Sequence, residues 1–418
     1  MRVVHINKSD VRGGAAVAAS RIVNSLRNIG VDASLLVGEK LGKDKNVQCI
    51  TDSGRMKAKA IYNFLHEVAC FLPHEKNRAS RFAYSMGRRG FDLSKQALVK
   101  QADIIHLHWF NQGYLSLKGL ENIFKLGKPV VWTLHDMWGF TGGCHYTGNC
   151  EAFKNKCGNC PVIQDSSNSD ISAMQYEKKQ QIYRSASLSF VSCSEWLGRV
   201  AKESTLVKEH SIYSIPNPID TDFYTPISRS QARKRLNLPL EKKILLFGAA
   251  NVADPRKGIA LLLHALKSLS INKRAKDIEL VIFGKTPPGL AEELPFPTRF
   301  MNYISEAETL VDLYNAADVF VLPSLEDNLP NTVMEALSCG TPVAAFRIGG
   351  VPEMVAHGIC GYLAEPGDAD GLAAGIEYIL FNCEDKVCRE NSRTKVLENF
   401  SPSLVAGKYF ELYKKLLG

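Results

Sequence analysis

Residues 323–346, PSLEDNLPNTVMEALSCGTPVAAF, follow the apolar run Val319–Leu322 and end in a second apolar run, Val343–Phe346. Both runs have the length and composition of buried strands. The segment between them opens as a loop rich in Pro, Asn and Asp and continues as a helix that we expect to begin near Thr332. A strand, a loop, a helix and a second strand in this order predict one unit of a parallel α/β sheet.

Three carboxylates surround the start of this helix. Glu326 and Asp327 lie in the loop, and Glu335 lies on the helix. The first turn of a helix has unpaired backbone N–H groups and a partial positive charge, so it accepts anions. Such a segment can hold a phosphate with its amides and the hydroxyls of a sugar with its acids. The alternative for Glu335 is a structural carboxylate that stabilises the first helical turn.

Short apolar runs alternate with helical patterns along the whole chain, which is typical of parallel α/β sheets. The runs of the first half are Val3–Ile6, Ala33–Val37, Ile104–His108, Val130–Leu134 and Leu188–Cys193. Those of the second half are Ile244–Phe247, Leu280–Phe283, Val319–Leu322 and Val343–Phe346. At 418 residues the chain exceeds what one hydrophobic core usually supports, so we predict two domains.

The segment Ile215–Pro218 has two prolines in three residues and makes a hinge between these domains. We predict a doubly wound, Rossmann-like domain over residues 1–216, a second one over 217–401, and a C-terminal helix over 402–418 that can pack back on the first. Two such α/β domains facing across a cleft bind their ligand at the carboxyl ends of the strands. Candidate site residues should therefore follow strands.

Composition and charge narrow the class of protein. A hydrophobic content of 45% and a charged content of 22% are ordinary for a soluble globular protein. The N-terminal apolar run is too short for a signal peptide, and no stretch approaches the ~20 apolar residues of a spanning helix, so we expect a cytoplasmic protein. Residues 1–218 hold 29 Lys and Arg against 18 Asp and Glu, whereas the other 200 residues hold 22 against 25. The basic first half can attract an anionic partner, or it is a solvated surface.

Residues 55–95 mix basic and apolar side chains. The basic ones are Lys57, Lys59, Arg78, Arg81, Arg88 and Arg89. The apolar ones are Ile61, Phe64, Leu65, Phe71, Leu72, Phe82 and Tyr84. Such a region can dock peripherally on an anionic membrane surface. Amphipathic packing onto its own domain is the alternative.

Glycines and cations mark one strand-to-helix turn in each half. Gly13 and Gly14 follow the first strand and would let the backbone approach a diphosphate. Arg256 and Lys257 precede Gly258 at a helix start after the strand Ile244–Phe247, where two adjacent cations can neutralise a diphosphate.

The second half resembles the donor domain of the family 4 retaining glycosyltransferases, which have the GT-B fold of two Rossmann-like domains. The motifs that carry this resemblance are, in order, Gly248, Arg256-Lys257-Gly258, Phe283-Gly284, Leu313–Asp318, Pro323-Ser324, Glu335–Pro342, Gly349–Glu353, Gly358 and Gly361. The first half resembles the acceptor domain of the family more weakly. Its motifs are Gly13-Gly14, Asp103–His108, His135-Asp136 and Ile215-Pro216-Asn217.

The resemblance implies roles on the donor side. In the family an acid, seven residues and a Glu form a clamp, which assigns the ribose hydroxyls to Glu335. At the position of the first acid this chain has Asp327 instead of Glu, and Glu326 lies one residue early, so either can contact the sugar. The backbone implied to hold the β-phosphate is that of Asn328, Leu329, Pro330 and Asn331. The backbone implied to receive the base is that of Tyr303 and Ile304.

On the acceptor side, period two places His106 and His108 on one face of the strand Ile104–His108. In the family a His at this strand end lies beside the donor sugar, which implies that role for His108, with His106 as the second candidate. His135 and Asp136 are further acceptor-side candidates. A His here can donate a hydrogen bond to a sugar hydroxyl or relay a proton. The alternative is a hydrogen-bonded core histidine.

Four of the eleven cysteines, Cys144, Cys150, Cys157 and Cys160, lie in an insertion over residues 141–165. The spacing Cys157-Gly-Asn-Cys160 provides the short loop with which two thiolates bind one tetrahedral ion. We expect a closed structural zinc site, with disulfides and then free thiols as alternatives. A cytoplasmic location argues against stable disulfides. We expect the other seven cysteines to be buried small apolar residues.

The resemblance implies a retaining glycosyltransferase that moves a sugar from a nucleoside-diphosphate sugar to a glycan or lipid-linked acceptor, in surface polysaccharide or glycolipid biosynthesis. It should require no catalytic metal, because Arg256, Lys257 and helix N-termini stabilise the leaving diphosphate. The family resemblance implies that this leaving group itself deprotonates the acceptor. The alternatives are a sugar-nucleotide epimerase of the same fold and a zinc-braced protein that binds nucleic acid or anionic glycans without catalysis. The clamp argues against the latter, so we expect no nucleic-acid partner.

Overall fold

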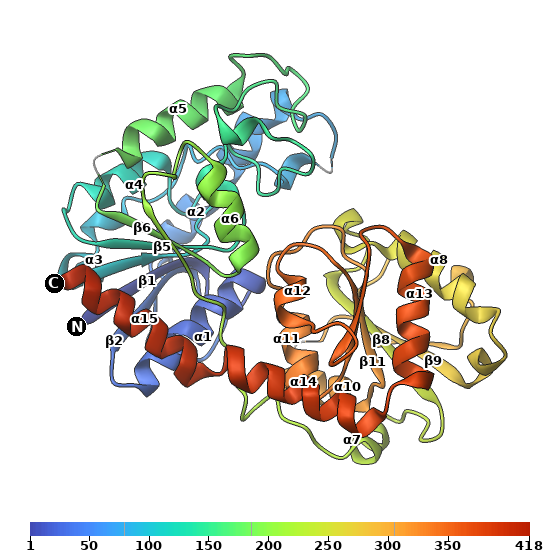
Figure 1. The fold of residues 1–418 in the computed structure, drawn as a ribbon. Helices are drawn as coiled ribbons and strands as arrows, with labels where there is room; N and C mark the ends of the chain where they lie inside the picture. The colour runs from blue at the N-terminus through green and yellow to red at the C-terminus, as the bar shows by residue number, and fades with distance from the viewer. Residues whose placement is uncertain (79, 185, 305) are drawn as a thin grey trace. The chain divides into compact units, whose positions relative to one another are not determined.

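The computed structural model describes residues 1–78, 80–184, 186–304 and 306–418, and the chain forms two compact units (Figure 1). Unit 1 comprises Met1–Asn217 and Val405–Gly418, and unit 2 comprises Pro218–Leu404. The division falls between the two prolines of the Ile215–Pro218 segment, where fixed φ angles interrupt regular structure. Each unit is built on a parallel sheet connected through helices, which confirms the predicted α/β class with two Rossmann-like domains.

The described residues of unit 1 form a seven-stranded parallel sheet in the order β3-β2-β1-β4-β5-β6-β7. Its strands are β1 (Arg2–Ser9), β2 (Asp32–Glu39), β3 (Val47–Cys49), β4 (Ile104–Leu107), β5 (Val130–Leu134), β6 (Leu188–Ser192) and β7 (Ser211–Ser214). The order reverses between β1 and β4, so their carboxyl ends lie at the topological switch point of the sheet.

Six helices connect these strands. They are α1 (Gly14–Asn28), α2 (Gly54–Phe71), α3 (Ala97–Gln101), α4 (Leu117–Phe124), α5 (Ile171–Tyr183) and α6 (Glu195–Glu203). Ser53, Ser116, Asp170 and Ser194 precede α2, α4, α5 and α6, and the side chain of each accepts a backbone N–H of the first turn. These caps satisfy donors that the helix itself cannot pair, so they define where each helix begins.

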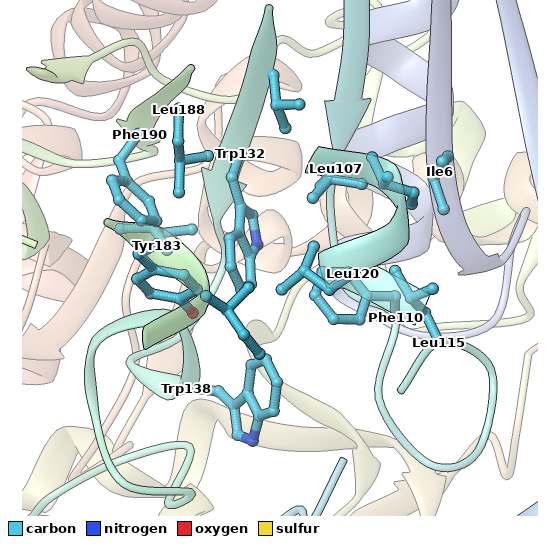
Figure 2. Close-up of a cluster of buried hydrophobic side chains, with 14 of the residues drawn as sticks. Ile6, Leu107, Phe110, Leu115, Leu120, Trp132, Trp138, Tyr183, Leu188 and Phe190 are labelled. Carbon is cyan, nitrogen blue, oxygen red and sulfur yellow. The ribbon is translucent and has the colours of Figure 1, made fainter. Parts of the chain in front are cut away.

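Alternation along the strands distributes the core of unit 1 over two faces. Val3 and Ile104 belong to the cluster that includes α1, whereas Val4 and Ile105 belong to a larger cluster on the other face. The larger cluster is rich in aromatic rings. Those labelled in Figure 2 are Phe110, Trp132, Trp138, Tyr183 and Phe190. All of these rings are buried, and the apolar surface that they remove from water stabilises the unit.

The last helix, α15 (Pro402–Leu417), begins in unit 2 and continues into unit 1. Its buried face belongs to the same core cluster as α1. The hydroxyl groups of Tyr409 and Tyr413 lie 3.0 Å from Thr133 Oγ1 and 2.6 Å from His106 Nδ1. Residues from the end of the chain therefore complete both the apolar and the polar core of unit 1.

The described residues of unit 2 form a six-stranded parallel sheet in the order β10-β9-β8-β11-β12-β13. Its strands are β8 (Lys243–Asn251), β9 (Ile278–Lys285), β10 (Thr298–Phe300), β11 (Val319–Leu322), β12 (Val343–Phe346) and β13 (Gly361–Ala364). Its helices are α7 (Arg229–Arg235), α8 (Ile259–Ser270), α9 (Leu290–Glu293), α10 (Ala307–Ala316), α11 (Asn331–Ser338), α12 (Val351–Met354), α13 (Ala369–Glu377) and α14 (Asp385–Phe400). Within the described ranges of the whole chain, no helix combines the length and apolar character needed to cross a membrane.

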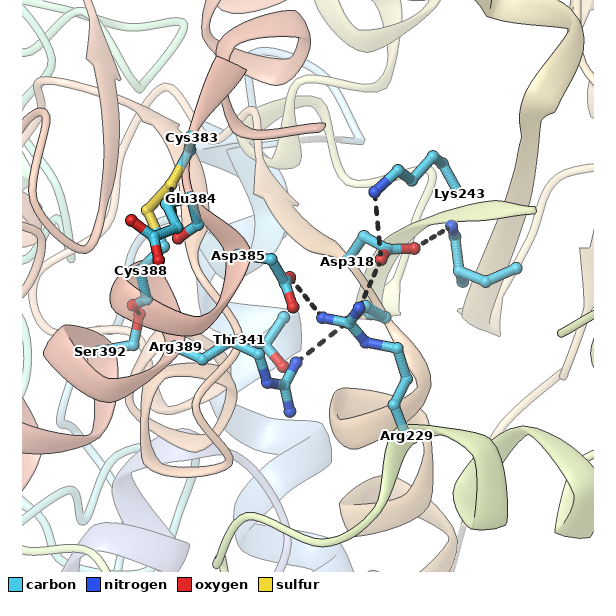
Figure 3. A network of polar contacts seen from close by, with 12 residues as sticks. Arg229, Lys243, Asp318, Thr341, Cys383, Glu384, Asp385, Cys388, Arg389 and Ser392 are labelled. Atoms are coloured by element: carbon cyan, nitrogen blue, oxygen red, sulfur yellow. Dashed lines mark hydrogen bonds and ion pairs between the residues drawn. A yellow bond between two sulfur atoms is a disulfide. The ribbon is translucent and has the colours of Figure 1, made fainter. Parts of the chain in front are cut away.

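A buried carboxylate, Asp318, anchors the start of β11 (Figure 3). Its Oδ2 accepts hydrogen bonds from Arg233 Nη2 at 2.7 Å and from the N–H of Ile244 at 2.6 Å. Its Oδ1 pairs with Arg229 Nη1 at 3.1 Å, and Arg229 Nη2 also pairs with Asp385 at 2.6 Å. The side chains of Asp318 and Arg233 are 5% and 4% exposed, so each charge depends on the other for compensation. The network ties α7 and α14 to the sheet.

The apolar runs of the sequence did not predict four strands, which are β3, β7, β10 and β13. They are the edge strands of the two sheets. β7 and β10 contain no fully buried residue, because an edge strand packs against a neighbour on one side alone. The sequence pattern therefore identifies the central strands and misses the edges.

A disulfide joins Cys383 to Cys388, at the start of α14 (Figure 3). The expectation that the cysteines outside the insertion are isolated apolar residues is wrong for this pair. It also fails in part for Cys49 and Cys70, which are only half-buried. The remaining three, Cys193, Cys339 and Cys360, are buried free thiols.

We predict that Asp318→Ala lowers the free energy of unfolding by about 3 kcal/mol or more, because Arg233 would keep a buried charge without its partner. Urea unfolding followed by circular dichroism measures the change. The matched control is Asp312→Ala, which removes the partner of Arg235, a side chain that is 54% exposed. The control substitution should lower the free energy of unfolding by less than about 1 kcal/mol. Equal losses in the two variants would contradict the anchoring role of Asp318.

Candidate functional site

Three loops meet at the carboxyl ends of the central strands of unit 2. The sheet order reverses between β8 and β11, which places the ends of these two strands at a switch point. The N–H of Leu325, after β11, donates to the carbonyl of Arg256, after β8, at 2.8 Å. The N–H of Gly350, after β12, donates to the carbonyl of Asn328 at 2.9 Å. These bonds join loops that are far apart in the sequence, and we call residues 254–258, 323–331 and 347–350 the donor-side loops.

Two glycines allow the donor-side loops to touch. Gly258 has a φ of 68° and Gly349 a φ of 49°, both in the left-handed region. A Cβ at Gly258 would lie 1.8 Å from the carbonyl oxygen of Pro323, and one at Gly349 would lie 1.9 Å from that of Asp327. Backbone meets backbone at both places, so any larger residue would force the loops apart.

Both predicted phosphate-binding cations are paired with carboxylates. Lys257 Nζ lies 2.6 Å from Asp327 Oδ2, which joins the loop after β8 to the loop after β11. Arg256 Nη2 lies 2.7 Å from Asp254 Oδ2, and the Arg256 side chain is 47% exposed. The neighbouring candidate Glu326 is half-buried. The structure thus brings Lys257 and Asp327 together, and an incoming phosphate would compete with these carboxylates for the two cations.

Glu335 lies on α11, 6% exposed, and its Oε2 accepts a hydrogen bond from the hydroxyl of Tyr314 at 2.9 Å. Burial, and to a smaller extent the negative charge of Glu335, raises the pKa of Tyr314 well above its usual value. The hydroxyl therefore remains a donor. The alternative interpretation of Glu335 as a first-turn carboxylate is wrong, because α11 begins at Asn331 and its first turn holds no acid. Tyr314 therefore orients a carboxylate one turn deeper in the helix.

The remaining donor-side candidates lie in two places. Asn328, Leu329 and Pro330 are buried in the loop after β11, and Asn331 begins α11. Tyr303, 72% exposed, and the half-buried Ile304 follow β10. The strands β9 and β8 separate β10 from β11 in the sheet, so these two residues lie on the outer side of the switch point.

In unit 1, Gly13 precedes α1 with a φ of 94°, and its carbonyl accepts the N–H groups of Ala16 and Val17, both at 3.1 Å. Gly14 is the first residue of the helix. A Cβ at Gly13 would meet no atom within 4 Å, so its backbone dihedral, and not lack of space, is what favours glycine there.

A hydrogen-bonded row of histidines runs outward from the interior of unit 1. His5 Nδ1 lies 3.0 Å from His108 Nε2, and His108 Nδ1 lies 3.1 Å from His135 Nε2. His5 and His108 are buried, whereas His135, directly after β5, is half-buried. Both ring nitrogens of His108 face other histidines, and His135 is the half-buried end of the row, with its Nδ1 3.8 Å from Cys193 Sγ.

His106 lies in the core beside this row. Its Nδ1 lies 2.6 Å from the hydroxyl of Tyr413, and its Nε2 lies 2.7 Å from Thr133 Oγ1. Potential ligand atoms of His5, His106 and His108 lie within 4.8 Å of one another, the one such group in the part of the chain that the structure describes. Because both nitrogens of His106 already have hydrogen-bond partners, we interpret the group as a neutral polar core.

Burial lowers the pKa of all four histidines. The pKa of His5 falls to about 3 and that of His135 to about 4. Those of His106 and His108 lie well below the usual value, because the rings are desolvated and would repel one another if charged. Near pH 7 the four rings are therefore neutral, and each can donate one hydrogen bond and accept another.

Asp136 is held beside His135 by three donors. Its Oδ2 lies 2.7 Å from His145 Nδ1 and accepts a bond from Trp109 Nε1 at 3.0 Å, while its Oδ1 accepts the N–H of Trp138 at 2.8 Å. Burial alone would raise the pKa of Asp136, but His145 and the N–H of Trp138 outweigh it and leave the pKa lowered. The carboxylate therefore stays ionised and fixed.

The four cysteines of the insertion line one small cavity of about 20 Å³. All four are free thiols, so the disulfides considered as an alternative are not formed. Within the described residues no three of their sulfurs lie within 4.8 Å of one another, and the predicted zinc site is therefore not preformed.

Three residues of these arrangements were not found from the sequence. His5 pairs in register with His106, so parallel pairing of β1 with β4 would have revealed it. Tyr314 and His145 do not follow predicted strands. Only the fold brings Tyr314 to Glu335 and His145 to Asp136.

Two family profiles match the chain. The family described as "Glycosyltransferase Family 4" matches residues 12–223, more than half of the 418 residues. The family described as "Glycosyl transferases group 1" matches residues 241–382. The two matches cover most of unit 1 and most of unit 2.

The chain is also similar to curated proteins that are named as glycosyltransferases. The chain is 26% identical over 344 residues to the D-inositol 3-phosphate glycosyltransferase of Corynebacterium glutamicum (strain R), which covers 77% of this chain and 78% of that protein. It is 29% identical over 252 residues to the MMP alpha-(1->4)-mannosyltransferase of Mycolicibacterium hassiacum, which covers 58% and 57%.

Solved structures share the fold. Sucrose-phosphate synthase from Thermosynechococcus elongatus superimposes with a TM-score of 0.67 at 19% identity, covering 100% of this chain and 99% of that one. Anabaena Alr3699/HepE in complex with UDP-glucose gives a TM-score of 0.65 at 15% identity, covering 99% and 100%. At such identities the likeness concerns the fold.

The buried histidines predict that the free energy of unfolding falls as the pH is lowered below about 6.5. A histidine of the unfolded chain binds a proton at about pH 6.5, whereas the folded protein protonates His5 only near pH 3. Between these values the unfolded state binds more protons, so each such ring removes about 1.4 kcal/mol of stability per pH unit. Urea unfolding at a series of pH values measures this slope.

The variant His5→Gln should reduce the slope by about 1.4 kcal/mol per pH unit. The control His264→Gln removes a histidine whose side chain is 61% exposed and should leave the slope unchanged. A slope that His5→Gln does not change would show that this ring is not neutral in the folded protein.

Proposed function

Because this chain belongs to the family 4 glycosyltransferases, we propose that it transfers a sugar from a nucleoside-diphosphate sugar to a glycan or lipid-linked acceptor, with retention of the anomeric configuration. The observation that carries the proposal is the convergence of the Lys257–Asp327 pair and the helix of Glu335 at the switch point of unit 2. A cation beside a helix start suits a diphosphate, and fixed carboxylates suit the hydroxyls of ribose and sugar. The HepE structures with UDP and UDP-glucose support a donor of this class.

Different donor-side residues bind the different parts of the nucleotide sugar. Glu335, oriented by Tyr314, binds the ribose hydroxyls. The diphosphate draws Lys257 away from Asp327, because a phosphate offers more negative charge than one carboxylate. Asp327 is then available to accept hydrogen bonds from the sugar, and Glu326 is the second candidate for this contact.

The reaction needs little covalent chemistry from the protein. The bond between the anomeric carbon and the diphosphate oxygen breaks while the acceptor oxygen forms a bond to the same carbon on the same face. The proton of the acceptor hydroxyl passes to the departing diphosphate. Arg256, Lys257 and the N–H groups at the start of α11 stabilise the negative charge of this leaving group, and no metal ion is required for that task.

On the acceptor side we assign the contact with a sugar hydroxyl to His135 instead of His108. His108 is buried with a histidine at each ring nitrogen, whereas His135 is half-buried at the end of the row. His5 and His108 then act as positioning residues that hold the imidazole of His135 in one orientation. Asp136, fixed by His145 and Trp109, lies next to it in the chain.

The acceptor is a glycan or lipid-linked molecule of surface polysaccharide or glycolipid biosynthesis, and we propose that α2 docks unit 1 on an anionic membrane to reach it. α2 turns a polar face inward: Asn63 donates to the carbonyl of Gly113 at 3.2 Å, and Glu67 accepts the N–H of Gly87 at 2.9 Å. Its exposed apolar side chains recur at helical spacing. They are Ile61, Tyr62 and Leu65, between 56% and 60% exposed, and Leu72 directly after the helix is 46% exposed.

This stripe has a basic border. Arg55, Lys57 and Lys59, at the start of α2, are exposed. Apolar side chains flanked by cations are typical of helices that lie in the interface of anionic membranes.

A thermal-shift screen with UDP-, GDP-, ADP- and TDP-sugars tests the donor assignment. We expect one nucleotide class to raise the melting temperature, corresponding to about 2.7 kcal/mol at a hundredfold excess over its Kd. Glu335→Gln should abolish most of this shift, since the substitution replaces one carboxylate oxygen by an NH2 group that cannot accept and removes the charge that strengthens the other contact. The control Glu365→Gln, at a side chain that is 71% exposed, should retain it. No shift with any donor, or a full shift in Glu335→Gln, would contradict the proposal.

Co-sedimentation with vesicles tests the membrane contact. The protein should bind vesicles that contain phosphatidylglycerol more tightly than vesicles of phosphatidylcholine alone. The double variant Ile61→Ser/Leu65→Ser should weaken binding about tenfold or more, because two apolar side chains lose their burial in the interface. The control Ile271→Ser changes a residue of unit 2 that is 85% exposed and should bind normally. Equal binding by both variants would exclude α2 as the docking element.

A further inference from the structure

The cysteine insertion carries a feature that the transfer reaction does not use. Cys144, Cys150, Cys157 and Cys160 line one cavity, together with Tyr84, Phe153 and other residues of the insertion. We propose that these four cysteines bind one structural zinc ion.

The loop between Cys157 and Cys160 already has the backbone of a metal-binding turn. Asn159 has a φ of 50°, in the left-handed region, which reverses the chain so that both cysteines face the same cavity. The N–H of Gly142 donates to Cys157 Sγ at 3.1 Å, and the N–H of Val162 is directed at the sulfur of Cys160. Burial raises the pKa of both thiols, and these N–H groups act against that rise.

A buried cation lies near the cavity. Lys179, on α5, is fully buried, and its ammonium group donates to the carbonyl oxygens of Trp138 and Thr141. Burial lowers the pKa of Lys179 to about 7, and negative charge on its neighbours Cys157, Cys144 and Asp136 would raise it. A zinc ion with four thiolates carries a net charge of about −2. Lys179 would balance part of that charge, and the thiolates would give the buried cation an anionic partner.

The sulfurs must move together when the ion binds. In the described structure no three of them lie within 4.8 Å of one another. Cys150 is half-buried in a turn closed by its own N–H to the carbonyl of Thr147 at 2.9 Å, whereas the other three are buried. Rotation of exposed side chains is easier than rotation of buried ones, so Cys150 closes the site last.

Zinc at this position would brace the acceptor side. Asp170 accepts the N–H of Cys160 at 2.9 Å and caps α5, and Tyr84 donates to the carbonyl of Gly142 at 3.0 Å. The next residue after Cys144 is His145, which holds Asp136. The ion would therefore fix the segment that orients the carboxylate beside His135.

Metal analysis of the full-length protein, purified without chelator, tests the proposal. We expect about one equivalent of zinc per chain, released to a colorimetric chelator when an organomercurial blocks the thiols. The variant Cys157→Ser/Cys160→Ser should fall below about one fifth of an equivalent, because two of four ligands are lost. The control Cys49→Ser, on β3, should keep the full content. Zinc that is retained in the double variant would mean an adventitious ion only and would overturn the proposal.

A second measurement does not depend on the folding of a variant. Wild-type protein grown with cobalt should show the thiolate-to-cobalt charge-transfer band and the intense visible bands of a tetrahedral site with four sulfurs. Removal of the metal should also lower the melting temperature. Less than about half an equivalent of zinc or cobalt in zinc- or cobalt-supplemented protein would overturn the proposal, as would disulfides among the four cysteines by peptide mass spectrometry.

Discussion

Contact between backbones at the switch point of unit 2 is the constraint on which its chemistry depends. Gly258 and Gly349 let the loops after β8 and β12 press against the loop after β11, with no space for a side chain between them. The groups on these loops consequently have little freedom of position. Lys257 meets Asp327 because their backbones are held together, and a ligand that enters finds charges already arranged.

In unit 1 the side chains at the switch point of the sheet are neutral, whereas those at the switch point of unit 2 are charged. The switch point of unit 1 is occupied by imidazoles that bind one another and are too buried to carry charge. Asp136 is a charged acid next to them, and His145, Trp109 and the N–H of Trp138 surround it. The two units thus provide different environments: unit 2 offers ion pairs that a phosphate can exchange, and unit 1 offers fixed hydrogen-bond donors and acceptors of low charge. The transfer that we propose, from a charged leaving group to a neutral hydroxyl, would use both kinds of environment.

The central strands and their ends were predictable because burial on both faces leaves continuous apolar runs such as Val319–Leu322. The edge strands were not, since β10 reads only Thr-Arg-Phe and is half-exposed. In the candidate site, spacing located Glu335 and the cations, but contact partners such as Tyr314 depend on how α10 packs beside α11. The choice between His108 and His135 shows the same limit. The two residues follow different strands, β4 and β5, and only three-dimensional burial tells which ring is the less buried.

The position of α15 at the end of the chain affects the order in which the two units complete their cores during synthesis. Tyr409 and Tyr413 supply apolar surface and hydroxyl partners to the core of unit 1, yet they follow unit 2 in the sequence. A ribosome releases residues 1–217 first, but His106 and Thr133 then lack these tyrosines, and the part of the core that α15 completes beside α1 remains open. Unit 2 can complete its core before the first unit can. Domains usually mature in the order of their synthesis, and in this chain the order of completion is reversed.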